Sequence, residues 1–187
     1  MKSYLLVLFV VVGNVCFTQF MDIEPAHRLG GEVNSPVEES FPVFSKENST
    51  LYFTRSFDSV SIGGINDQDI WNSEMVSDKN YNKGEELHAL NNKFNNCIVG
   101  FNSDESVVYL LNAYHGKKDL KKGIAYAKRK GNGWGDPHDL AIPELDIEGD
   151  FYGFHMNSAE NTIIISYQGG DSEGQEDLYY SQLIDEK

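Results

Sequence analysis

The side chains most able to do chemistry are carboxylates in two polar, Gly-rich stretches of the chain. These stretches contain Asp58, Asp67 and Asp69, and Asp171, Glu173, Glu176 and Asp177. Oxygen-rich acidic loops of this kind are what Ca²⁺ prefers, but the spacing does not match an EF-hand. No metal or cofactor is predicted. As candidates for a ligand-binding loop face we take Asp67, Asp69, Asp119, Asp171, Glu173 and Glu176.

Other reactive side chains do not form a recognisable catalytic pattern. The five histidines show no paired spacing of the kind that zinc sites use. No Gly-x-Ser-x-Gly motif is present, so a serine-hydrolase elbow is not indicated. Cys97 falls in an apolar run, which favours a buried packing thiol over a nucleophile. No catalytic residue is predicted.

One stretch of the chain occurs three times, as residues 41–54, 98–111 and 153–166. In each copy an apolar residue precedes a polar turn, and a second apolar anchor follows eight positions later. The anchors are Phe44 and Tyr52, Phe101 and Tyr109, and Met156 and Ile164. Two β-rich runs separated by a short polar loop predict a β-hairpin in each copy.

Two further sequence elements, which we call landmarks, recur with the same spacing as the hairpins. A third element begins at Asp69, Gly123 and Asp177, which are 54 residues apart in each step. A fourth, residues 81–87, matches residues 134–140. The repeats therefore span approximately 29–86, 87–139 and 140–187. Because Asp69 and Asp177 stand at the same landmark, a carboxylate that binds turn amides is the structural interpretation of both.

The repeat predicts an all-β fold. Strand positions are β-branched or aromatic, loops are rich in Gly, Asn, Asp and Ser, and no long helical periodicity competes. A unit of about 54 residues supplies four short strands and cannot bury both faces alone, so units must stack. Four-stranded units stacked radially describe a β-propeller, here with about three blades.

The order of the landmarks predicts how the blades complete one another. Residues 25–29 read as an extra fourth-strand element, parallel to residues 137–140, whereas the last unit contains three elements. An N-terminal strand that completes the last blade would explain both features. Three blades fall below the usual four to eight, so we expect either two chains in one ring or an open edge. That edge would expose Leu178, Tyr179 and Tyr180, an aggregation hazard.

The quoted motifs carry a resemblance to a known family. The Ser-x5-Leu-Tyr-Phe run that ends at Phe53, the segment 63–71 and the segment 133–140 resemble the WD-repeat-like β-propeller repeats of the TolB type. The resemblance covers residues 19–187 and implies a periplasmic or outer-membrane-associated protein-interaction scaffold. The chain departs from the pattern in lacking the usual Asp-Gly turn, in having Gly123 at the third-strand landmark and in its small blade number.

The N-terminus predicts export. Lys2 precedes an apolar run over residues 5–12, followed by Gly13 and small or polar residues. This order is typical of a secretory signal peptide, which we place at residues 1–18. The run is too short to span a bilayer, and no transmembrane segment is predicted. We expect a periplasmic, secreted or outer-membrane-associated protein, whose chain after cleavage keeps only Cys97 and has no internal disulfide.

The charge narrows the choice of partners. Asp and Glu outnumber Lys and Arg by 29 to 15, for a net charge of −14. Such a surface repels phosphate backbones and anionic lipid, so nucleic acid is not expected as a partner. The leading hypothesis is a non-catalytic propeller module, a possible homodimer, that binds a protein or cell-envelope polymer through its loop face. The alternative is a carbohydrate-active or other hydrolytic propeller that uses loop carboxylates.

Overall fold

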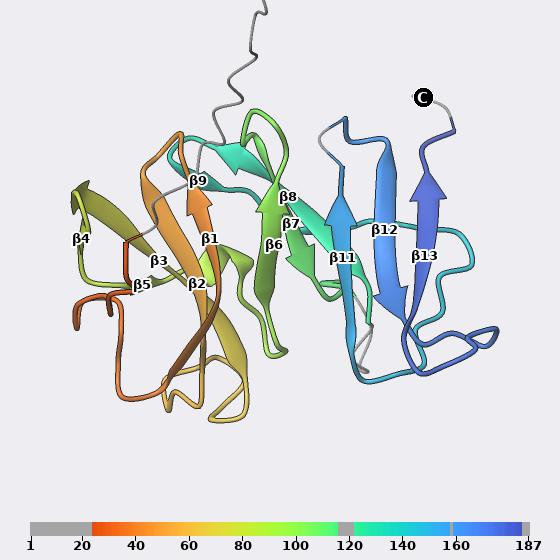
Figure 1. The fold of residues 1–187 in the computed structure, drawn as a ribbon, viewed down its shortest axis with the longest axis horizontal. Coiled ribbons are helices and arrows are strands. Elements are labelled where there is room, and N and C mark those ends of the chain that lie inside the picture. The colour runs from red at the N-terminus through yellow and green to blue at the C-terminus, as the bar shows by residue number, and fades with distance from the viewer. Residues whose placement is uncertain (1–23, 116–121, 158, 185–187) are drawn as a thin grey trace, which may run out of the picture.

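Three antiparallel β-sheets follow one another along the chain (Figure 1). The computed structural model describes residues 24–115, 122–157 and 159–184. Within them the regular structure is strand, apart from one 3-10 turn, η1 (His88–Leu90). The predicted all-β class is therefore confirmed. The predicted signal peptide and Asp119 lie outside the described residues.

Each sheet is built from consecutive strands. Sheet 1 contains β1 (Glu38–Ser45), β2 (Thr50–Ser56), β3 (Gln68–Ser77), β4 (Asn80–Tyr81) and β5 (Glu85–Glu86). Sheet 2 contains β6 (Cys97–Phe101), β7 (Val107–Leu111), β8 (Ile124–Lys130), β9 (Gly133–Trp134) and β10 (His138–Asp139). Sheet 3 contains β11 (Tyr152–Met156), β12 (Thr162–Tyr167) and β13 (Asp177–Gln182).

The three predicted hairpins are present, and the turns of sheets 2 and 3 use the same chemistry. In sheet 2 the side chain of Asn102 accepts the Val107 amide at 2.9 Å, and in sheet 3 Asn157 accepts the Thr162 amide at 3.1 Å. An Asn side chain can replace a backbone acceptor in a tight turn, which is why it suits these positions. Each turn also contains one residue of positive φ, namely Ser49, Glu105 and Glu160.

The third and fourth elements also form as predicted in the first two sheets. β5 pairs with β3 and β10 pairs with β8, both antiparallel. The amide of Leu87 donates to the Ile70 carbonyl, and that of Leu140 donates to the Ile124 carbonyl, each at 2.8 Å. These matching bonds set the fourth strand in the same register in both sheets. In sheet 3, β13 pairs with β12 alone among the described residues.

The sheets stack face to face with their first strands adjacent. β6 lies against β1 on one side and β11 on the other, so sheet 2 is the middle layer (Figure 1). Alternation along β7 supplies both cores, because neighbouring strand residues point to opposite faces. Val108 and Leu110 pack toward sheet 1, whereas Tyr109 packs toward sheet 3.

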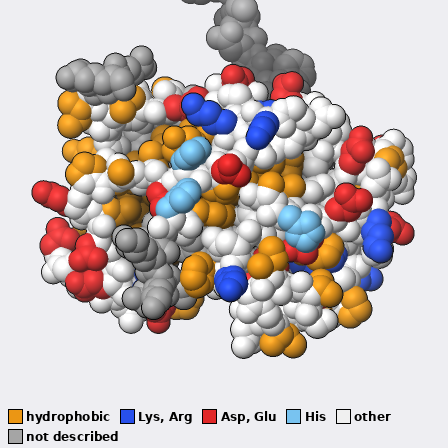
Figure 2. Space-filling view, turned by 180° about the vertical axis from the view of Figure 1, so that it is seen from behind, with side chains coloured by type: hydrophobic (Ala, Val, Ile, Leu, Met, Phe, Trp, Pro, Cys, Tyr) orange, Lys and Arg blue, Asp and Glu red, His pale blue; other side chains and the backbone are white. Residues whose placement is uncertain are grey.

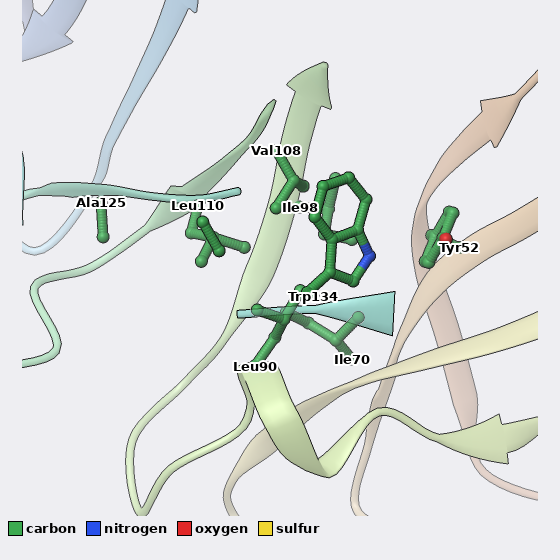
Figure 3. Close-up of a cluster of buried hydrophobic side chains, with 9 residues drawn as sticks. Tyr52, Ile70, Leu90, Ile98, Val108, Leu110, Ala125 and Trp134 are labelled. Atoms are coloured by element: carbon green, nitrogen blue, oxygen red, sulfur yellow. The ribbon is translucent and has the colours of Figure 1, made fainter. Parts of the chain in front are cut away.

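Trp134 is central to the core between sheets 1 and 2 (Figure 3). Its ring stacks on Phe101 with centroids 5.8 Å apart, and Phe101 meets Tyr52 edge-on at 5.5 Å. The Arg129 guanidinium lies 4.0 Å from the Trp134 ring centroid, a cation–π contact. The remaining buried members of this core are Ile70, Leu90, Ile98, Val108, Leu110, Ala125 and Ala127.

The N-terminal segment differs from its predicted structure. Residues 25–29 form no strand, because no backbone hydrogen bond joins them to a strand of the described residues. Instead Leu29 packs with Val33, Leu51 and Phe53 on the face of sheet 1 that points away from sheet 2. The segment therefore does not complete sheet 3 within one chain. In the described part of the chain, no helix is long and apolar enough to cross a membrane.

Candidate functional site

The first group of acidic candidates lies in the loop between β2 and β3, where it holds the loop together. The Asp69 carboxylate is fully buried, and its Oδ2 accepts the Ile62 amide at 2.8 Å. Asp67 Oδ2 accepts the Gly63 amide at 2.8 Å, and its Oδ1 accepts the Gln68 amide at 3.0 Å. These carboxylates bind turn amides, as the structural interpretation of Asp69 predicted.

Burial sets the protonation behaviour of this pair. Removal from water raises the pKa of Asp69 above its ordinary value. The hydrogen bond from the Ile62 amide lowers this pKa in part, and the negative charge of Glu86 raises it further. Burial likewise raises the pKa of Asp67, against the lowering effect of the Gly63 and Gln68 amides. Asp69 Oδ1 has no hydrogen-bond partner in the described part of the chain.

A small hollow adjoins this loop. It has a volume of about 270 Å³ and is lined by Gly63, Asn66, Asp67, Lys93, Phe94 and Asn95. Gly63 is required here, because a Cβ would lie 2.4 Å from Asp67 Oδ2 and 2.5 Å from the Lys93 carbonyl oxygen. The hollow therefore lies against a hydrogen-bonded turn whose close packing leaves no room for a side chain at position 63.

The second acidic group lies in the loop between β12 and β13. Asp177 Oδ2 accepts the Glu173 amide at 2.6 Å, so Asp177 plays the same turn-binding role as Asp69. Asp171 accepts the Tyr179 hydroxyl at 2.9 Å. The side chains of Glu173 and Glu176 are exposed.

The two acidic loops are not brought together. Both lie at the same end of the strands, but they belong to sheets 1 and 3, with sheet 2 between them (Figure 1). Among the described residues, no group of three or more His, Cys, Asp or Glu side chains is arranged to hold a metal ion. The acids of each loop therefore act within their own turn, and a shared site is not formed.

A different feature stands out on sheet 3: its outer face is apolar and uncovered. Ile70 and Ile124 lie near the start of the third strands of sheets 1 and 2 and are each 1% exposed, whereas their counterpart Leu178 is 78% exposed. Tyr180 and Ile164, which pair across β13 and β12, are exposed on the same face. Ile164, Leu178 and Tyr180 define what we call the open face.

Among the residues that the structure describes, no strand pairs with the outer edge of β13 either. The Leu183 amide donates to the carbonyl of Asn161, the residue before β12, so the odd-numbered residues of β13 turn their backbone groups toward β12. Leu178, Tyr180 and Gln182 therefore turn theirs outward. On β8 the equivalent outward carbonyl, that of Ile124, accepts a hydrogen bond from Leu140 of the fourth strand. The backbone of Leu178, Tyr180 and Gln182 is what we call the open edge.

A groove runs beside this edge. Its volume is about 760 Å³, and it lies between the segment 140–143 and the end of β13. Leu140, Ile142, Pro143, Met156, Ile163, Leu183 and Ile184 supply most of its apolar wall. In Figure 2, which views the molecule from behind, apolar side chains gather on the side where sheet 3 lies.

The sequence identified one part of this surface and missed another. The exposed edge at Leu178 to Tyr180 was predicted from the order of the repeat landmarks. The groove wall at 140–143 was not, although the alternating apolar residues Leu140 and Ile142 after the fourth-strand element were a usable signal. A comparison with protein-family models finds no match for this chain, and a comparison with curated proteins finds none either.

Proposed function

We propose that this protein is a non-catalytic binding module, which holds a partner protein on the open face and open edge of sheet 3. The observation that carries the proposal is the contrast between Leu178 and its counterparts Ile70 and Ile124. Exposed apolar surface that is buried at equivalent positions elsewhere in the same molecule is typical of a protein-interaction site. The free backbone groups beside it favour a partner that adds a strand.

We also propose that the three sheets are blades of a TolB-type β-propeller and that the chain is exported. Consecutive antiparallel strands in each sheet and adjacent first strands β1, β6 and β11 support the blade arrangement. The charged start and apolar run before residue 13 support export. Glu173 and Glu176 are exposed, so the loop face that contains them is a second candidate surface for a protein or a cell-envelope polymer.

The hydrolytic alternative gains no support from the loop acids. Asp67 and Asp69 do lie in one loop, and Asp67 lines the small hollow. However, three of their four oxygens accept backbone amides, and the fourth, Asp69 Oδ1, belongs to a fully buried side chain. Acid–base chemistry needs a carboxylate within reach of the substrate, so these two are better suited to holding the turn.

The strand-addition proposal is tested with a strand that this protein already uses. The probe is a labelled peptide of residues 134–141, which contains the fourth-strand element of sheet 2. We expect it to bind the chain saturably in a fluorescence anisotropy titration, and a scrambled peptide not to bind. Tyr180→Pro removes an outward N–H and is expected to weaken binding by about tenfold. Proline is tolerated on an edge strand, so the sheet should persist.

The matched control is Tyr180→Val, which keeps the backbone N–H and the β-propensity of the position. It should bind the peptide within about threefold of the wild type, a difference worth well under 1 kcal/mol. Circular dichroism of both variants checks that sheet 3 is intact. Absence of saturable binding, or equal binding by the proline variant, would show that the edge does not accept a strand.

A further inference from the structure

The contact between neighbouring sheets is repeated with equivalent residues. Tyr52 of sheet 1 meets Phe101 of sheet 2, and one repeat later Tyr109 packs in the core that also contains Met156 of sheet 3. Ile70 and Ile124, on the same faces as these tyrosines, are buried by the following sheet. Each sheet thus presents one set of residues to the sheet after it and another set to the sheet before it.

Each end of the row carries one half of this contact without its partner. On sheet 3, Ile164 and Leu178 occupy the positions of Tyr109 and Ile124 and are 42% and 78% exposed. On sheet 1, Phe44 occupies the position of Phe101, lies opposite Leu51 on the outward face and is 40% exposed. The open face of sheet 3 and the outward face of sheet 1 are therefore complementary halves of an interface already built twice in the molecule.

The segment before sheet 1 fits the same pattern. Leu87 and Leu140, the fourth-strand leucines, pack in the two cores between sheets, and Leu29 packs on the outward face of sheet 1. Each of these leucines precedes the start of the next hairpin by a similar number of residues. The separation is 11 residues from Leu87 to Ile98, 13 from Leu140 to Gly153 and 12 from Leu29 to Phe41. Residues 26–29 are thus placed as a fourth strand whose own sheet is absent.

We propose that the partner of sheet 3 is sheet 1 of a second copy of this chain, docked head to tail, an inference that rests on the proposed binding function. Ile164 and Leu178 of one copy then pack on Phe44 of the other. Residues 26–29 of that second copy pair with β13 as its fourth strand, and the Leu29 amide donates to the Leu178 carbonyl. This is the bond that Leu140 makes to Ile124 within sheet 2.

Two copies close such an arrangement. The contact is heterologous, since different surfaces of the two chains meet, and a heterologous contact either closes a ring or continues as a filament. Two chains supply six sheets, which lies within the four to eight blades of known propeller rings. Both the open face and the outward face of sheet 1 are then covered in each chain, so no edge is left for a third chain. The peptide of residues 134–141 therefore binds the wild type by displacing residues 26–29 of the other copy from the open edge.

The test is a complementation experiment on the full chain, followed by light scattering after size exclusion. Three variants place a charge on exposed apolar residues: Leu178→Glu on the open face, Phe44→Glu on the outward face of sheet 1, and Val60→Glu in the β2–β3 loop as a matched control. Val60 is 62% exposed and belongs to the loop between β2 and β3, not to a strand of either face. We expect the wild type and Val60→Glu to have the mass of two chains, and the other two variants that of one.

Mixing the two disrupted variants gives the decisive result. Every interface in a homodimer of either variant contains one charged residue, but a mixed dimer retains one wholly wild-type interface. The mixture is therefore expected to recover the mass of two chains, with a dissociation constant at least about tenfold below that of either variant alone. A face-to-face dimer through sheet 3 would instead leave Phe44→Glu unaffected, which would overturn the head-to-tail arrangement.

Other outcomes also decide the question. A wild type that is monomeric over about a hundredfold range of concentration would overturn the proposal, as would a ladder of growing masses, which indicates an open filament. The peptide of residues 134–141 separates this failure from failure of the binding function. If the monomeric Phe44→Glu variant, whose sheet 3 is unaltered, binds that peptide, the strand-accepting edge stands and only the identity of its partner is wrong.

Discussion

The Asp69 carboxylate combines complete burial with a hydrogen bond to one turn amide. Asp67, beside it in the same loop, accepts two amides. Both pKa values are raised because burial outweighs these bonds. At the residue scale, Asp67 and Asp69 thus stabilise the turn through their hydrogen bonds, and their burial carries a desolvation penalty.

A pH prediction follows from the direction of these shifts. A carboxyl whose folded pKa is raised binds more protons in the folded state, so its contribution to stability is present below the ordinary value of 3.8 and is lost as pH rises through the folded pKa. Asp69→Asn, which cannot ionise, is expected to be more stable than the wild type at pH 7 by on the order of 1 kcal/mol.

Urea unfolding at a series of pH values measures this difference. The gap between Asp69→Asn and the wild type should close below pH 3.8, where the carboxyl is protonated in both states. Glu176→Gln removes a charge from an exposed position in the other acidic loop and should leave the pH profile unchanged. A variant less stable than the wild type at pH 7 would mean that the ionised Asp69–Ile62 bond outweighs burial.

Cys97 provides a second residue-scale prediction. It is 3% exposed at the start of β6, and burial raises the pKa of its thiol to about 11. In a Cys16→Ser background it is the sole cysteine of the chain. Because the thiolate is the reactive form, we expect a disulfide reagent at pH 8 to react at least about 100-fold more slowly in buffer than in denaturing urea. Equal rates would place the thiol at the surface.

At the scale of elements, the hairpin turn of one sheet forms hydrogen bonds with the preceding sheet. Glu105, in the β6–β7 turn, accepts the Lys46 amide at 3.0 Å and the Ser45 hydroxyl, both from sheet 1. Glu160, in the equivalent turn of sheet 3, accepts the Tyr109 hydroxyl of sheet 2 at 3.2 Å. The same turn position therefore carries an inter-sheet contact twice, which the repeat alone did not reveal.

Removing this contact has a predictable cost. Glu105→Ala leaves the fully buried Ser45 hydroxyl and the Lys46 amide without their acceptor. We expect a loss of about 1–2 kcal/mol in the free energy of unfolding, measured with urea. Glu47→Ala, an exposed position in the β1–β2 turn, is the control and should change stability by less than about 0.5 kcal/mol. Equal effects would mean that the bridge is not formed in solution.

At the scale of the whole molecule, three sheets in a row carry a net charge of −14. Within one chain the cost of this charge is spread over the surface, but two chains that dock bring their charges together. The apolar contact between sheets must therefore overcome electrostatic repulsion, which dissolved salt screens. The proposed association is expected to depend on ionic strength for this reason.

The salt dependence is a prediction with a definite sign. Raising NaCl from about 20 mM to about 500 mM shortens the screening length from roughly 20 Å to roughly 4 Å, so the dimer should tighten by about tenfold. Sedimentation velocity of the wild type measures the dissociation constant at each salt concentration. The Val60→Glu variant, with one more negative charge per chain, should show a slightly steeper dependence. Weaker association at high salt would mean that ion pairs hold the interface.

The sequence by itself determined the local units of this protein. Hairpins at 41–54, 98–111 and 153–166, the third strands that begin near Asp69, Gly123 and Asp177, and the fourth strands near residues 85 and 138 all form where the pattern placed them. The turn-binding role of Asp69 and Asp177 was also predictable. Each of these depends on alternation and turn chemistry within about ten residues, which is information that a linear sequence contains.

Only the tertiary structure decided which surfaces meet. Residues 25–29 have the residue types of a fourth strand but form none, because a strand needs backbone pairing and no strand of the described residues pairs with them. Leu178 matches Ile70 and Ile124 in the repeat, yet it is exposed because no further sheet of the described residues covers it. Likewise the two acidic loops lie at the same end of the strands, but sheet 2 separates them. Pairing and burial depend on contacts between distant segments, and a repeat pattern does not specify where the row of sheets stops.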